Sequence, residues 1–130
     1  MKKVFLSIFF VVFCSIVGFA QGEPAFKWEK MTHNFGKIAQ GKPVTATFKF
    51  TNIGKTPIVI SGARGSCGCT VPNYPKDPVA PGETAEITAV YNAAAVGAFN
   101  KTVTIDANTK EPQTILNIQG EVLEQKSGQK

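Results

Sequence analysis

Residues 44–51, with the sequence VTATFKFT, alternate apolar and polar side chains without interruption. Successive side chains of an extended chain point to opposite faces. Val44, Ala46, Phe48 and Phe50 therefore share one face, while Lys49 and the threonines share the other. This period of two predicts a β-strand with one buried face.

The same alternation recurs in three later stretches, residues 85–91, 102–107 and 115–122. Residues 58–60 add a short run of β-branched side chains, which also favours a strand. Upstream, residues 26–35 predict a first pair of strands that is broken near Met31 or Thr32.

Glycine and proline mark the connections between these strands. The predicted loops and turns are residues 36–43, 52–57, 72–82, 93–97 and 108–112, and the fourth of these has room for one helical turn. No stretch of twelve residues carries a helical apolar stripe. Short strands at this spacing predict an all-β fold, an immunoglobulin-like β-sandwich of about seven to eight strands over residues 21–123. Residues 124–130 are expected to form a polar, disordered tail.

The N-terminus has the layout of a secretory signal peptide. Lys2 and Lys3 precede an uncharged apolar run, residues 4–20, which ends in Gly18-Phe19-Ala20. Small residues at these positions favour cleavage after Ala20, so residues 1–20 are predicted to be a signal peptide rather than an uncleaved anchor. Cys14 falls inside the apolar run, and nothing before it suggests lipid attachment. The mature protein is thus expected to be exported, either periplasmic or secreted, with no membrane span left.

Charge gives little support to nucleic-acid binding. The net charge of +5 falls to +3 when Lys2 and Lys3 leave with the signal peptide, and the remaining basic residues are spread singly. No basic stripe is interleaved with aromatic residues, as a nucleic-acid surface would require.

Residues 66–70, SCGCT, hold the two thiols that remain after signal cleavage. In an extended strand the Cβ atoms of Cys67 and Cys69 would lie roughly 7 Å apart, whereas a disulfide needs about 3.8 Å. Gly65 and Gly68 would allow a tighter path that closes the bond. Such a bond would close a loop of three residues and stabilise the fold by only about 1.5 kcal/mol. A structural disulfide nevertheless remains one interpretation, because an exported chain meets oxidising conditions.

Three other interpretations of the pair remain open. The thiolates of Cys67 and Cys69 are suited to Cu(I) or Zn(II), with His33 as a third ligand. Strand counting supports that set, because it places the loops at residues 36–41, 62–82 and 92–99 at one end of the sandwich. Thiol–disulfide exchange is another use, with Arg64 as the one cation able to stabilise a thiolate. An intermolecular disulfide is the last.

Catalysis has a weaker basis in the sequence. Cys67 and His33 are the sole nucleophile–base pair available, and a small sandwich offers no deep pocket to exclude water around them. We therefore expect no enzymatic activity. Trp28, Phe26 and Phe35 are a further candidate, as an aromatic binding patch or as the edge of the core.

Several motifs together resemble a bacterial family labelled domain of unknown function 1573. They are residues 33–38 (HNFGKI), Gly41, residues 48–54 (FKFTNIG), 57–60 (PIVI), 66–70 (SCGCT), 81–83 (PGE) and 97–101 (GAFNK). The resemblance covers residues 33–122 and implies an immunoglobulin-like domain, akin to hydin and major-sperm-protein domains, in secreted proteins common among Bacteroidetes. It implies no catalytic activity. Asn34 departs from the family pattern, in which an aspartate is frequent.

These observations predict an exported, single-domain binding or assembly module of the cell envelope that works with a protein or an envelope component and needs no cofactor. The alternative is a small periplasmic protein that handles copper or zinc, or exchanges thiols, through Cys67, Cys69 and His33.

The signal-peptide assignment predicts the mass of the mature protein. Cleavage after Ala20 leaves Gln21 as the first residue, and intact-mass spectrometry of protein recovered from an exporting cell will detect that chain. Retention of Met1 or Lys2 would show instead that the apolar run is a membrane anchor.

Overall fold

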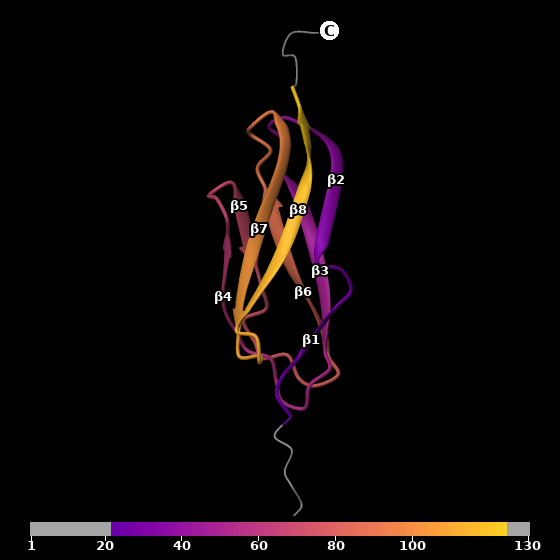
Figure 1. The fold of residues 1–130 in the computed structure, drawn as a ribbon, viewed down its shortest axis with the longest axis vertical. Coiled ribbons are helices and arrows are strands. Elements are labelled where there is room, and N and C mark those ends of the chain that lie inside the picture. Colours follow the sequence, from indigo (N-terminus) through magenta and orange to yellow (C-terminus); the bar gives the residue numbers. More distant parts are fainter. Residues whose placement is uncertain (1–21, 125–130) are drawn as a thin grey trace, which may run out of the picture.

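Eight β-strands account for most of residues 22–124, the part of the chain that the computed structural model describes (Figure 1). In chain order they are β1 (Phe26–Trp28), β2 (Thr32–Ala39), β3 (Val44–Asn52), β4 (Ile60–Gly65), β5 (Thr70–Asn73), β6 (Thr84–Tyr91), β7 (Gly97–Ala107) and β8 (Gln113–Leu123). No helix occurs in this range, so the connection at residues 93–97, which had room for one helical turn, does not contain one.

The strands make two four-stranded sheets. One has the order β1-β3-β6-β5 and the other the order β2-β8-β7-β4. All the pairs are antiparallel except β2 with β8, which run parallel. The predicted all-β immunoglobulin-like sandwich of seven to eight strands is therefore confirmed.

The core lies between the two sheets, on the faces that the alternation predicted. In β3, Ala46, Phe48 and Phe50 are buried, while Lys49 between the two phenylalanines is exposed. The same alternation buries the predicted faces of β6, β7 and β8. Apolar burial of this kind is the main term that favours folding.

The first segment differs from the prediction. A break does occur before Thr32, but β1 and β2 do not pair with each other. Instead β1 pairs with β3 in one sheet and β2 pairs with β8 in the other, so the chain crosses from sheet to sheet between them. Strand β2 also runs on to Ala39, through residues predicted to be a loop, because the bulge at Gly36 restores its register with β8.

The predicted signal peptide, residues 1–20, and residues 125–130 of the predicted tail lie outside the described residues. Those two boundaries stay predictions. Across residues 22–124 there is no helix long and apolar enough to cross a membrane.

Burial of Phe48 gives a direct test of the core. Phe48 is 0% exposed, so Phe48→Ala should lower the free energy of unfolding by about 3–5 kcal/mol, because ring contacts are lost and a cavity remains. Lys49→Ala is the matched control on the same strand. It removes only an exposed 3.8 Å ion pair with Glu86, which is worth about 0–1 kcal/mol. Denaturant unfolding followed by circular dichroism measures both, and a larger loss for Lys49→Ala would mean that the faces of β3 are reversed.

Candidate functional site

The cysteine pair lies in the short connection from β4 to β5. Strand β4 ends at Gly65 and β5 begins at Thr70, so Ser66–Cys69 form a turn outside both sheets. A Cβ at Gly65 would collide with the backbone oxygen of Thr70 and lie 2.9 Å from its Cβ. Only glycine therefore allows the two strand ends to approach this closely.

The turn explains how two cysteines this close in sequence are joined. The Thr70 amide donates a 3.3 Å hydrogen bond to the Cys67 carbonyl, which closes a β-turn over residues 67–70. The Cα atoms of Cys67 and Cys69 are 5.2 Å apart, and their sulfurs are paired as a disulfide. The extended geometry considered from the sequence does not apply, because the chain turns here.

Hydrogen bonds that involve no sulfur fix both ends of the loop. The Ser66 amide donates to the Thr102 carbonyl at 2.8 Å, and the Thr102 amide donates to Ser66 Oγ at 3.1 Å. On the other side, the Asn92 amide donates to the Cys69 carbonyl at 3.0 Å. One end of the loop is thus attached to β7, and the other to the residue that directly follows β6.

One hydroxyl lies near both sulfurs. Thr70 Oγ1 is 3.8 Å from Cys67 Sγ and 4.0 Å from Cys69 Sγ. Thr70 is one of two buried polar side chains in the described residues, at 3% exposure. Sequence reasoning did not single it out, although its place directly after Cys69 was visible. A buried hydroxyl at this position can donate to whichever sulfur carries negative charge.

Arg64 does not serve the cysteines as the sequence suggested. Its guanidinium forms a 2.7 Å ion pair with Asp106 on β7. Asp106 is paired in register with Gly62, so the Arg64 side chain points back along the sheet and away from the cysteine loop. No thiolate at Cys67 or Cys69 is stabilised by this cation.

His33 is not brought next to the cysteines either. It lies on β2 and the cysteine loop follows β4, and these strands are the opposite edges of one sheet, with β8 and β7 between them. Three steps of about 4.8 Å separate such strands by roughly 14 Å, whereas a metal–nitrogen bond is about 2 Å. Residues 22–124 contain no group of three His, Cys, Asp or Glu side chains placed to hold a metal ion.

Strand counting correctly predicted that the loops at residues 36–41, 62–82 and 92–99 lie at one end of the sandwich. The Gly41 amide donates to the Ala93 carbonyl, and Asn92 donates to Cys69, so the three loops meet at one end of the sandwich. His33 is level with the cysteine loop, because it pairs with Ile118, and Ile118 with Lys101, but β8 and β7 separate it from the loop sideways. A disulfide also offers no thiolate, so metal binding at the pair would first require reduction.

The surroundings of His33 are local. Lys30 Nζ donates a 2.7 Å hydrogen bond to His33 Nδ1, and the ring meets Phe35 edge-on at 4.5 Å between centroids. Partial burial, and secondarily the positive charge of Lys30, hold the pKa of His33 below its ordinary value of 6.5. Neutral imidazole is therefore the favoured form at neutral pH.

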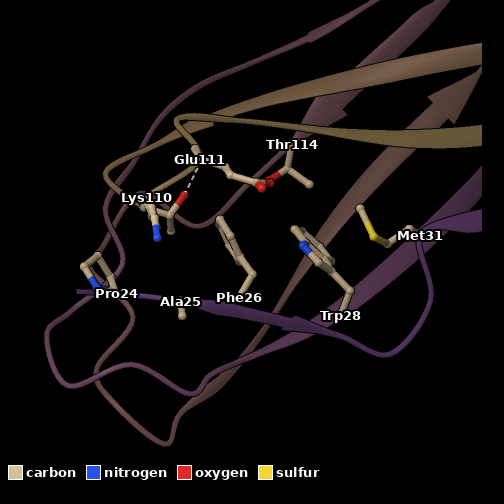
Figure 2. Close-up of a pocket in the computed structure, with 9 residues that line it drawn as sticks. Pro24, Ala25, Phe26, Trp28, Met31, Lys110, Glu111 and Thr114 are labelled. Atoms are coloured by element: carbon tan, nitrogen blue, oxygen red, sulfur yellow. Dashed lines mark hydrogen bonds between the residues drawn. The ribbon is translucent and has the colours of Figure 1, made fainter. Parts of the chain in front are cut away.

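A second candidate site lies at the other end of the sandwich, on the side where β1 faces the β7–β8 hairpin. Phe26 and Trp28 stack with 4.8 Å between ring centroids and line a groove of about 320 Å³ with Met31 and Thr114 (Figure 2). Both rings also contact the buried Phe50. Two of the three aromatic residues that the sequence offered as a patch or as the core edge thus come together here, and all three pack against the core.

The third member of that patch, Phe35, lies elsewhere. Its ring packs on His33 and, at 6.3 Å between centroids, on Phe99 of β7. It is absent from the residues that line the groove. Phe35 follows the crossing to the second sheet, which carries it away from Phe26 and Trp28.

Comparison with known proteins identifies a family and a fold. Residues 26–122 match the model of a family described as a protein of unknown function, DUF1573. The sequence matches none of the curated proteins.

Several solved structures share the fold at low sequence identity. A protein of unknown function from Porphyromonas gingivalis W83 is 13% identical, with a TM-score of 0.68 over 78% of this chain and 48% of its own. This chain thus spans about half the length of that protein. The ASH/PapD-like domain 7 of human CEP192 is 10% identical, with a TM-score of 0.63 over 80% of this chain and 89% of its own.

A third match is the CsuC–CsuE chaperone–tip adhesion subunit pre-assembly complex of Acinetobacter baumannii. It is 11% identical, with a TM-score of 0.54 over 75% of this chain and 52% of the matched chain. At these identities the likeness establishes a PapD-like, immunoglobulin-like fold and nothing about activity.

The contact between His33 and Lys30 predicts the direction of a titration. His33 should titrate below 6.5 by NMR, and Lys30→Gln should raise its pKa without restoring the ordinary value, since burial is the larger cause. The unfolded chain binds this proton more tightly, so acidification from neutral pH through 6.5 should lower the stability of the fold. His33→Gln should remove that contribution. A His33 pKa at or above 6.5, or one that Lys30→Gln leaves unchanged, would contradict this account.

Proposed function

This chain belongs to the DUF1573 family, and we propose that it is an exported, non-catalytic binding module of the cell envelope whose partner is a protein. The partner docks an extended segment along residues 113–116 of β8, beside the groove lined by Phe26, Trp28 and Met31. Export rests on the signal-like pattern of residues 1–20.

The observation that carries the proposal is an uncovered sheet edge. Strand β2 pairs with β8 only from Asn117 onward, so no strand formed by residues 22–124 lies beside residues 113–116 of β8 on that side. The Asn117 amide donates to the Met31 carbonyl across this edge. Because backbone groups alternate in direction, the amide and carbonyl groups of Gln113 and Ile115 face the same open side. Such a row of groups is suited to pairing with an added strand.

The groove supplies a place for side chains of that added strand. Its wall is formed by Phe26, Trp28 and Met31, and Met31 directly precedes the first residue of β2 (Figure 2). Lys110 and Glu111 at its rim carry opposite charges, which gives no preference for a charged ligand. An extended segment with an apolar side chain is therefore the chemistry that fits best.

The non-catalytic part of the proposal is supported by geometry. The sequence offers Cys67 and His33 as a nucleophile–base pair. His33 lies on β2 and Cys67 follows β4, and these strands are opposite edges of one sheet, so the two side chains do not meet. No cofactor is included in the proposal. Assembly with a protein is also a use found among proteins of this fold, since the Acinetobacter match is a chaperone–subunit complex.

Site-specific crosslinking tests the docking surface. A photoreactive amino acid at Ile115, introduced into cells that export the protein, should crosslink one envelope protein. The same group at Val71 is the control, because Val71 is a similarly exposed apolar residue on β5, an edge of the other sheet. Equal products from both positions would show non-specific contact.

A second pair of variants tests the groove itself. Met31→Lys should reduce the Ile115 crosslink about tenfold, because a charge is placed where an apolar side chain docks. Val96→Lys adds the same charge to an exposed apolar residue in the β6–β7 loop and should have no effect. An equal loss in both variants, or a product that contains two copies of this chain, would contradict docking of a distinct partner.

A further inference from the structure

We propose that the Cys67–Cys69 disulfide is a redox site that exchanges with the dithiol of a partner protein, with Cys67 as the sulfur that is attacked. This activity is separate from docking at the groove. It is argued from the position of the loop, the unequal surroundings of the two sulfurs and the hydroxyl of Thr70.

The fold does not depend on the bond. The disulfide links residues two apart within one turn and joins neither the two sheets nor distant parts of the chain. Such a short loop removes little entropy from the unfolded chain. Hydrogen bonds from Thr102, Asn92 and Thr70 to the loop already define its path. The bond can therefore open and close while the sandwich stays folded.

The two sulfurs have different surroundings. Cys69 packs against the buried core cluster, whereas Cys67 does not belong to it. Gly68 between them is exposed, and apart from the two cysteines no described residue lies within 4 Å of where its Cβ would stand. Because Cys69 packs on the core and Cys67 does not, Cys67 is the sulfur that we expect a thiolate from solvent to attack.

The chemistry balances as a two-electron exchange. A partner thiolate attacks Cys67 Sγ, a bond forms between those sulfurs, the Cys67–Cys69 bond breaks and Cys69 leaves as a thiolate. The second partner thiolate then attacks the partner sulfur of the mixed disulfide, and Cys67 leaves. The pair is reduced to two thiols, the partner dithiol is oxidised to a disulfide, and the two partner protons end on Cys67 and Cys69.

Thr70 is the positioning residue for this exchange. In other exchange sites a cation or a helix N-terminus stabilises the leaving thiolate. Here Arg64 is engaged with Asp106, and the described residues contain no helix. Thr70 Oγ1, at 3.8 and 4.0 Å from the two sulfurs, is placed to donate a hydrogen bond to the departing Cys69.

The first experiment asks whether the bond is reducible in the native protein. The mature chain is treated with dithiothreitol and, separately, with reduced thioredoxin as a protein dithiol, and free thiols are counted by mass after alkylation. Both reagents should reduce the pair, the circular dichroism spectrum should be unchanged, and oxidised glutathione should re-form the bond. Reduction only after denaturation, unfolding on reduction, or failure of thioredoxin where dithiothreitol succeeds would overturn the proposal.

The second experiment assigns the roles. Cys69→Ser leaves Cys67 alone and should form a mixed disulfide with oxidised glutathione about tenfold faster than Cys67→Ser, which leaves Cys69 alone. Equal rates, or a faster reaction at Cys69, would overturn the assignment of Cys67.

Two variants then separate a role in exchange from a structural role for Thr70. Thr70→Val keeps the shape of the side chain and should slow reduction about tenfold with an unchanged melting temperature, whereas Thr70→Ser keeps the hydroxyl and the rate. If Thr70→Val does not fold, the role of Thr70 is tested by the reduction rate of Thr70→Ser, and the role of Cys67 by the rates of the two single-cysteine variants. Equal reduction rates in folded Thr70→Val and in the unchanged protein would remove Thr70 from the mechanism.

Discussion

The buried amide of Asn52 is the contact on which one end of the sandwich depends. Its Nδ2 donates to the carbonyls of Thr56 and Val79 at 2.8 and 2.9 Å, and its Oδ1 accepts from the amides of Gly54 and Ala25. One side chain thus connects the start of β1, the end of β3, the following turn and the loop before β6. A buried amide with all of these partners stabilises the fold, and loss of the side chain would leave several backbone groups without a partner.

The Asn52 contacts determine where the chain can change sheets. Because Ala25 is held beside the end of β3, Phe26–Trp28 form a strand of the first sheet before the chain crosses to the second. Strand β2 then begins opposite Asn117, above the lower part of β8. The uncovered edge and the aromatic groove follow from this crossing. Had Phe26–Trp28 paired with β8 as β2 does, they would have covered residues 113–116 of β8. The candidate docking surface is therefore a product of the topology rather than of any single motif.

Alternation in the sequence predicts which face of a strand is buried, and Phe48, Phe50 and Ile105 are buried as that pattern requires. It carries no information on which strands become neighbours. His33 was placed near the cysteines because the loops share an end, but its strand lies at the far edge of the sheet. Likewise, a period of two assumes an extended chain, so the turn that closes the Cys67–Cys69 disulfide could not be read from it. The buried roles of Asn52 and Thr70 depend on contacts between distant segments, which no local pattern specifies.

The two candidate sites are far enough apart to act independently. The cysteine loop is level with Thr102, through the hydrogen bonds of Ser66, whereas the groove lies beside the hairpin that follows Ala107. The hairpin rim of the groove lies six strand residues of about 3.3 Å each, roughly 20 Å, from that level. Met31 at the other end of the groove is level with Thr102, and there β7 and β8 separate the two sites sideways. Substitutions at such distances usually have additive effects. We expect reduction of a loop that hydrogen bonds already define to leave the strand pairing unchanged, so the redox state of the loop should not alter the groove. A partner that uses both sites must reach across β7 and β8, and two smaller partners can occupy the sites at the same time.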